Sequence, residues 1–311
     1  SMVSTGMNPF INAQGYATTG MFSVAIGAIA NLILDPVFIF VFGLGIRGAA
    51  IATVLSQILS AAFVLYFLRK KTELKVRLLS GEEIRDCGRR AKNIISLGTA
   101  GFIMQLTNSL VTICCNNVLS VTGGDLYISV MTIVSSIRQI IDTPIHAITE
   151  GSSPVISYNY GARRPKRVFQ SWLTMSVMAI LYTLLAWGVI LFAPRFLIGI
   201  FSSDQALITD AIPALKLYFG AFVFQALQYV GQTMFKSLGK KKFAIFFSLL
   251  RKVIIVVPLT YILPYLFHMG SDGVFLAEPV SNVLGGSACF IVMLCTVMPE
   301  LKRMAKENSD C

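Results

Sequence analysis

Charged side chains are scarce in this sequence. They make up 13% of its 311 residues, whereas a soluble domain of this size carries roughly a quarter. Hydrophobic residues make up 55%, and the mean hydropathy is +0.72. So little charge beside so much apolar side chain excludes an ordinary soluble domain and indicates a chain whose solvent is lipid.

Cysteine and histidine are also few, and neither forms a site pattern. The six cysteines include no CxxC pair, so neither a disulfide framework nor a cysteine metal site is predicted. With only His146 and His268 there is no HExxH zinc motif, and the GxSxG nucleophile motif is absent as well. We therefore expect no cofactor, and we expect that the protein is not an enzyme.

Long apolar stretches are abundant instead. A membrane-spanning helix needs about 20 mostly apolar residues. Eight such stretches lie near 17–42, 48–68, 94–118, 126–159, 168–193, 208–236, 243–267 and 272–298. The sequence thus predicts an all-α polytopic membrane protein with about eight transmembrane helices.

The net charge of +11 results from an uneven placement of basic residues. Segments 69–92, 163–167, 236–242 and 302–306 hold 20 of the 26 lysines and arginines. They alternate along the chain with connections that hold only Arg47 and Arg195. This is the positive-inside asymmetry of inserted helical proteins. It predicts an inner-membrane protein with a cytoplasmic C-terminus, and it explains the basic excess without a nucleic-acid partner.

Part of the sequence recurs at one constant offset. Gly45, Gly48, Ala52, Ser56 and Gln57 recur later in the chain, in the same spacing, as Gly270, Gly273, Ala277, Ser281 and Asn282. The helix pair 17–68 thus looks like a copy of the pair 243–298, and repeats of one orientation are a transporter architecture. Because the second copy ends a run of six spans, we expect four helices to be missing before the first.

The repeat predicts four parts of the chain. A partial N-terminal lobe covers 1–68, and a cytoplasmic connection with an amphipathic surface helix at 80–92 covers 69–93. A complete six-helix lobe then covers 94–298, and a cytoplasmic tail covers 299–311.

Polar residues inside the first two predicted spans are candidates for a site, because burying them in lipid is costly. Asn31 and Asp35 are four residues apart and share a helix face, and Pro36 cannot donate a backbone hydrogen bond. Thr53 and Gln57 present oxygens on one face of the next span. Either these groups form a proton or cation site, or Asp35 caps a broken helix that restarts at Pro36.

The fourth predicted span carries four ionisable residues at intervals of four: Arg138, Asp142, His146 and Glu150. They share one helix face. Arg138 and Asp142 are spaced for an intrahelical ion pair, and a histidine side chain ordinarily titrates near neutral pH. The stripe is either a proton route or substrate wall, or a water-lined structural feature.

Later spans hold further polar residues. Gln225, Gln228 and Gln232 share one face of the sixth span, and they either bond to neighbouring helices, which we prefer, or line a polar cavity. Arg251 and Lys252 lie near a predicted cytoplasmic helix end, so we expect their side chains to reach the membrane surface.

Several of these stretches resemble one protein family. Asn31–Pro36 and Gly45–Thr53 resemble the fifth and sixth helices of MATE (multidrug and toxic compound extrusion) transporters. Pro154–Ala162 resembles the end of that family's eighth helix, and Ser248–Arg251 with Pro258 and Leu263–Pro264 resembles its eleventh. The similarity covers nearly the whole chain and is nearest to the bacterial multidrug-exporter branch.

The resemblance implies two six-helix lobes around a central cavity that opens alternately to each side, with the first four helices missing here. It implies secondary active efflux of amphipathic organic cations, in exchange for H⁺ or Na⁺, by a protein embedded in the lipid bilayer. Asn31, Asp35 and Thr53 match the cation site of members with a first-lobe site, so Na⁺ at Asp35 is the only metal that we expect. Acidic second-lobe positions of other members correspond to the neutral Asn108 and Gln228.

Two other functions stay open at this point. Eight helices cannot enclose a two-lobe cavity alone, so the chain is alternatively a truncated, non-transporting fragment or an assembly partner. The second alternative is a flippase of related architecture for lipids or lipid-linked oligosaccharides.

Overall fold

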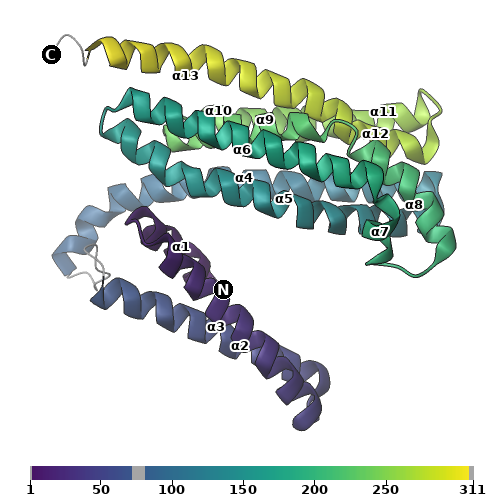
Figure 1. The fold of residues 1–311 in the computed structure, drawn as a ribbon, viewed down its shortest axis with the longest axis horizontal. Helices are drawn as coiled ribbons and strands as arrows, with labels where there is room; N and C mark the ends of the chain where they lie inside the picture. Colours follow the sequence, from purple (N-terminus) through teal and green to yellow (C-terminus); the bar gives the residue numbers. More distant parts are fainter. Residues whose placement is uncertain (1, 72–80, 308–311) are drawn as a thin grey trace. The chain divides into compact units, whose positions relative to one another are not determined.

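The apolar stretches of the sequence form helices throughout the part of the chain that the computed structural model describes, residues 2–71 and 81–307 (Figure 1). No strand occurs in these ranges. The elements are α1 (Met2–Ala13), α2 (Ala17–Pro36), η1 (Val37–Val41), α3 (Gly45–Lys70), α4 (Gly81–Thr122), α5 (Gly124–Gly161), α6 (Pro165–Phe192), α7 (Pro194–Gly199), α8 (Gln205–Tyr218), α9 (Phe222–Ser237), α10 (Lys241–Leu249), η2 (Leu250–Val256), α11 (Val257–Tyr265), α12 (Gly270–Ser281), η3 (Asn282–Gly286) and α13 (Ser287–Glu307). The chain divides into an N-terminal unit, Ser1–Arg90, and a C-terminal unit, Ala91–Cys311.

Small residues join the three helices of the N-terminal unit. The Ser60 hydroxyl on α3 donates to the Ser23 carbonyl on α2 at 2.7 Å, and it shares a second hydrogen bond of 2.7 Å with the hydroxyl of Ser4 on α1. A Cβ atom on Gly27 would lie only 3.2 Å from Cβ of Ser60. Small side chains and interhelical hydroxyl bonds let α2 and α3 approach closely without an apolar driving force, as is typical of helices in lipid.

The helix that begins at Ala17 passes through Pro36 without a break. Pro36 has helical backbone angles (φ −60°, ψ −37°), and the chain continues as the π-helical segment η1. A wider turn accommodates proline, which lacks an N–H and whose ring crowds the preceding turn. No side chain caps a helix at this point. The alternative that Asp35 caps a broken helix is therefore wrong.

Two apolar clusters form the core of the C-terminal unit. One gathers buried side chains of α4, α5, α8 and α12, among them Ile137 and Phe275. The other gathers buried side chains of α6, α9, α10 and α13, among them Met175, Phe235 and Met293. Residues of α5 and α9 contribute to both clusters, and the two helices pack against each other, which places their polar faces in the same part of the unit.

The helices support the predicted polytopic class. Within the described residues, five helical runs are long and apolar enough to span a membrane, or six if α8 and α9, which bend by 50°, form one span. Large apolar side chains such as Leu32 (74% exposed) and Phe192 (91% exposed) face outward, as expected for contact with lipid. Each of the eight predicted stretches lies mainly in helical structure, although 208–236 is interrupted between α8 and α9, and their number as spans stays a prediction.

One predicted connection differs from the structure. Residues 81–92, expected as a separate surface helix within the connection 69–93, belong to α4, which continues to Thr122 as one helix of 42 residues. Residues 72–80 of that connection lie outside the described residues. The predicted division at 68/94 stays a prediction, and the two units meet along the chain at Arg90.

The internal repeat is visible in the backbone. Gly43 and His268, which occupy equivalent positions of the two copies, both have left-handed φ angles, of +65° and +54°. Gly45 and Gly270, a second equivalent pair, have φ of +51° and +56°. Because such angles are uncommon outside glycine, their recurrence at one offset indicates the same turn in both copies.

The helix after each turn makes the same close approach. A Cβ atom on Gly48 would lie 2.6 Å from the carbonyl oxygen of Phe38, and one on Gly273 would lie 2.9 Å from the carbonyl carbon of Leu263. Phe38 and Leu263 are themselves equivalent positions of the repeat. The repeated glycines are therefore required by packing of one helix against the backbone of the preceding one.

Candidate functional site

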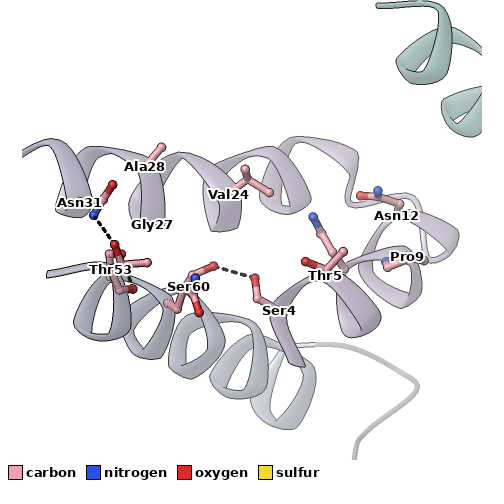
Figure 2. Close-up of a pocket in the computed structure, with 13 residues that line it drawn as sticks. Ser4, Thr5, Pro9, Asn12, Val24, Gly27, Ala28, Asn31, Thr53 and Ser60 are labelled. Atoms are coloured by element: carbon pink, nitrogen blue, oxygen red, sulfur yellow. Dashed lines mark hydrogen bonds between the residues drawn. The ribbon is translucent and has the colours of Figure 1, made fainter. Parts of the chain in front are cut away.

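The three residues predicted as a cation site lie together in the N-terminal unit. The Asn31 amide donates to Oδ1 of Asp35 at 3.3 Å. It also approaches the Thr53 hydroxyl at 3.5 Å (Figure 2). Thr53 in turn donates to the Ala49 carbonyl at 2.9 Å, so its hydroxyl is fixed on α3. Asn31 and Thr53 thus connect α2 and α3 beside a carboxylate, with oxygens of the kind that alkali cations prefer.

A pocket of about 420 Å³ adjoins this group. Its lining is uncharged and comes from all three helices (Figure 2): Ser4, Thr5, Asn8, Pro9, Asn12, Val24, Gly27, Ala28, Asn31, Thr53, Ser56, Gln57 and Ser60. Asp35 is not part of the lining and is reached through Asn31. Among the described residues, no three His, Cys, Asp or Glu side chains gather as a metal centre. An ion here would therefore be held by one carboxylate and neutral oxygens.

The polar stripe on α5 leads to a second group in the C-terminal unit. Arg138 pairs with Asp142 on its own helix at 3.2 Å, as its spacing predicts, and also with Glu278 on α12 at 2.8 Å. The Tyr218 hydroxyl is a further partner of Arg138. Asp142 accepts hydrogen bonds of 3.3 Å from both Gln225 and Tyr229 on α9. One buried network thus joins α5, α8, α9 and α12.

Arg251 and Lys252 do not reach the membrane surface, so that expectation is wrong. They are 4% and 6% exposed, and both pair with Glu278, at 3.3 Å and 3.1 Å. Arg251 also donates to Asn282. The π-helical segment η2 carries both bases inside the unit, where a carboxylate and an amide stabilise them.

A cavity of about 650 Å³ unites most of the predicted polar residues of this unit. Asn108, Arg138, Asp142, His146, Glu150 and Gln228 line it, together with Gln232, Tyr218, Arg251, Lys252 and Glu278. Gln225 is outside the lining and holds Asp142 instead, so the interhelical interpretation applies to it, whereas Gln228 and Gln232 face the cavity.

The remaining predicted residues lie toward the mouth of this cavity. The His146 ring packs against the Tyr229 ring in a tilted arrangement, with centroids 4.7 Å apart. Glu150 forms an exposed ion pair of 3.3 Å with Lys236. Asn108 donates to Gln105 at 3.3 Å on its own helix. Glu150 is thus a solvated residue of the rim, while Asp142 is part of the buried wall.

Glu278 is the functional candidate that sequence reasoning undervalued. It lies within the last predicted span, at the position equivalent to Thr53 in the repeat, and is not among the predicted site residues. Two bases in the span 243–267 and an acid in the next span were the available signal, since charges buried in lipid normally occur in pairs.

Comparisons with known proteins give the family. The MatE family model matches residues 100–262. The multidrug export proteins MepA of Staphylococcus saprophyticus and Staphylococcus aureus are 24% identical over 290 residues, which cover 92% of this chain and 62% of theirs. The chain therefore spans about 62% of the length of the curated relatives that it matches.

Solved structures agree on the fold. A MATE transporter crystallised in the bent conformation has a TM-score of 0.84 and 22% identity, over 99% of this chain and 67% of that one. An outward-facing multidrug resistance MATE transporter of the MOP superfamily has a TM-score of 0.85 and 23% identity, over 97% of this chain and 66% of that one. With more than half of its residues matched by the family model, this multi-pass membrane chain belongs to the MATE family of transporters and is not an enzyme.

Proposed function

We propose that this chain serves secondary active multidrug efflux, in which amphipathic organic cations leave the cell in exchange for H⁺ or Na⁺. Membership in the MATE family and the multidrug export function named for its MepA relatives support the transport class. The observation that carries the coupling mechanism is the Asp35 carboxylate, held by Asn31 beside Thr53 within two membrane helices. The distribution of basic residues supports a bacterial inner-membrane location with the C-terminus in the cytoplasm.

The coupling ion binds at Asp35 in this proposal. An ionised carboxylate within a bilayer span is costly, and a proton or Na⁺ removes that cost. For Na⁺, the Asn31 amide turns by half a rotation and presents its oxygen alongside the oxygens of Asp35 and Thr53, since hard cations take oxygen ligands. For H⁺, the protonated Asp35 keeps its bond to Asn31 with no rotation.

Alternating access follows if the ion and the drug prefer different conformations. A ligand shifts a conformational equilibrium only by its difference in affinity for the two states. The π-helical segment η1 directly follows Asp35 and Pro36, and the turn at Gly43 and Gly45 follows η1. A change of charge at Asp35 therefore acts on an irregular part of the helix, where the backbone is easier to rearrange than in a regular α-helix.

Gradient-driven efflux of a cationic dye from cells tests the coupling role. Asp35→Asn removes the ionisable group while keeping its size and its place beside Asn31, and we expect efflux to stop. Asp125→Asn, an exposed acid in the first turn of α5, is the matched control and should keep full efflux. Both variants are compared at equal amounts in the membrane. Full efflux by the Asp35→Asn variant would rule out the coupling role.

A further inference from the structure

The charges that line the cavity of the C-terminal unit do not balance. Arg138, Arg251 and Lys252 share the cavity wall with only two carboxylates, Asp142 and Glu278. The two other charged lining residues, at the rim, are Glu150 and Lys236, which neutralise each other. With all of these side chains ionised, the described lining carries one excess positive charge, and a buried charge without a counter-charge is costly.

The three basic side chains of the wall converge on one acid, Glu278. This single carboxylate contacts Arg138 at 2.8 Å, Lys252 at 3.1 Å and Arg251 at 3.3 Å. Asp142, the other buried acid, pairs with Arg138. Nε of Arg251 is buried and has no hydrogen-bond partner among the described residues. Arg251 and Lys252 therefore share the single carboxylate of Glu278, and the Nε–H donor of Arg251 is not paired among the described residues.

The mouth of the cavity contains no unpaired acid that would repel an anion, as far as the described lining shows. Apart from His146 and Glu150, the exposed lining side chains on α4 and α5 are neutral amides and hydroxyls, including Gln105, Asn108, Gln139 and Thr143. The acid at the rim, Glu150, is paired with Lys236. A volume of about 650 Å³ lies within the usual range for sites of drug-sized ligands.

We propose that this cavity binds the anionic group, a carboxylate or sulfonate, of a small amphipathic organic molecule. Lys252 and Arg251 supply the charge that the anion neutralises, and the Tyr218 and Tyr229 rings supply amphipathic surface for its body. This site goes beyond the coupling role of Asp35 and does not depend on it. A purely cationic molecule meets a repulsive wall here, so the cavity adds a selectivity that the proposed organic-cation substrates do not explain.

A matched pair of fluorescent probes tests the charge preference. Dansylglycine is an anion, and dansyl-ethylenediamine is a cation with the same ring system and a similar length. Each is titrated onto the full purified chain in neutral detergent, and binding is followed by energy transfer from Trp172 and Trp187. Because no ion gradient is present, failure of the Asp35 coupling proposal and failure of this one give different results.

We expect dansylglycine to bind more tightly than the cationic probe. Lys252→Met removes the excess charge and should weaken dansylglycine about tenfold, the usual loss for one charge-assisted hydrogen bond, without weakening the cationic probe. Lys252→Arg keeps the charge and should keep the preference. Lys216→Met removes an exposed lysine that does not line the cavity and should change neither affinity.

A variant that is expected to bind dansylglycine more tightly controls for the case in which Lys252→Met loses binding only because it misfolds. Asp142→Asn raises the excess from one to two positive charges and should strengthen dansylglycine binding. Equal affinity of the two probes for the unaltered protein would overturn the proposal, because it would mean that Lys252 is neutral or that the cavity does not take the probe. An unchanged preference in both Lys252→Met and Asp142→Asn would overturn it as well.

Discussion

Nη2 of Arg138 lies 2.8 Å from Oε1 of Glu278, and this ion pair joins α5 to α12 inside the C-terminal unit. Their side chains are 17% and 5% exposed, so water screens the pair poorly. Because Glu278 also receives Arg251 and Lys252, the carboxylate holds three helical segments that are far apart in the sequence.

Replacement of Glu278 by Gln should destabilise the C-terminal unit strongly. Three buried bases would lose their shared acid, and breaking a buried ion pair by removing one partner costs about 3–5 kcal/mol. Thermal unfolding in detergent measures the loss. Glu307→Gln is the control, because its pair with Arg303 is exposed and such pairs contribute about 0–1 kcal/mol. Equal melting temperatures for the two variants would contradict a central role for Glu278.

Replacement of Gly48 by Ala should destabilise the N-terminal helix pair. The added Cβ would lie 2.6 Å from the Phe38 carbonyl oxygen, and overpacking of this kind costs about 1–3 kcal/mol. Gly188→Ala is the control. That glycine lies inside α6 with no atom within 4 Å of an added Cβ, so alanine should be neutral or stabilising by about 0.5–1 kcal/mol. Thermal unfolding that ranks the two variants in the opposite order would refute the close approach.

The Thr53 hydroxyl should matter for ion coupling and not only for helix structure. Thr53→Val keeps the shape and removes an oxygen, so we expect half-maximal efflux to need about tenfold more coupling ion. Thr209→Val removes a similar bond, since the Thr209 hydroxyl donates to Gln205 one turn back at 2.8 Å. The control is not part of the proposed ion site and should leave the ion dependence unchanged. An identical response of both variants would mean that Thr53 acts only on its helix.

Tyr160 should fasten the end of α5 to α13. Its hydroxyl donates to Oε1 of Glu300 at 2.5 Å, while Lys240 pairs with the other oxygen of that carboxylate. Tyr160→Phe should therefore cost about 1.5–3 kcal/mol, as for hydrogen bonds to charged groups. Tyr158→Phe, two residues earlier and exposed, is the control. Faster hydrogen exchange confined to the α5 and α13 ends would show the loss of this tie, and unchanged exchange would disprove it.

The sequence predicted the local relationships well because helical periodicity places them. The spacing of four residues predicted that Asn31 and Asp35 share a helix face and that Arg138 and Asp142 form an intrahelical ion pair. In the structure both pairs are in contact. Family membership and the all-α class also followed from residues along the chain.

Relationships between distant segments were harder to predict. Lys252 was assigned to the membrane surface because nothing in its own helix indicates Glu278, which lies 26 residues later. The π-helical segments η1 and η2 also escaped prediction, because they depend on how the backbone relaxes around Pro36 and around the buried bases. Burial depends on tertiary partners, and periodicity within one helix does not report them.

Because both copies of the repeat contain the same turn, equivalent residues of the two copies can be compared directly. Thr53 and Glu278 occupy equivalent places on helices that leave the same left-handed turn, yet one presents a hydroxyl and the other a full negative charge. The two copies thus share one backbone arrangement. At this position the first copy carries a neutral hydroxyl, and the second carries an acid surrounded by bases. Exchanging these two side chains would distinguish the effects of the shared backbone from the effects of the side chain that each copy carries.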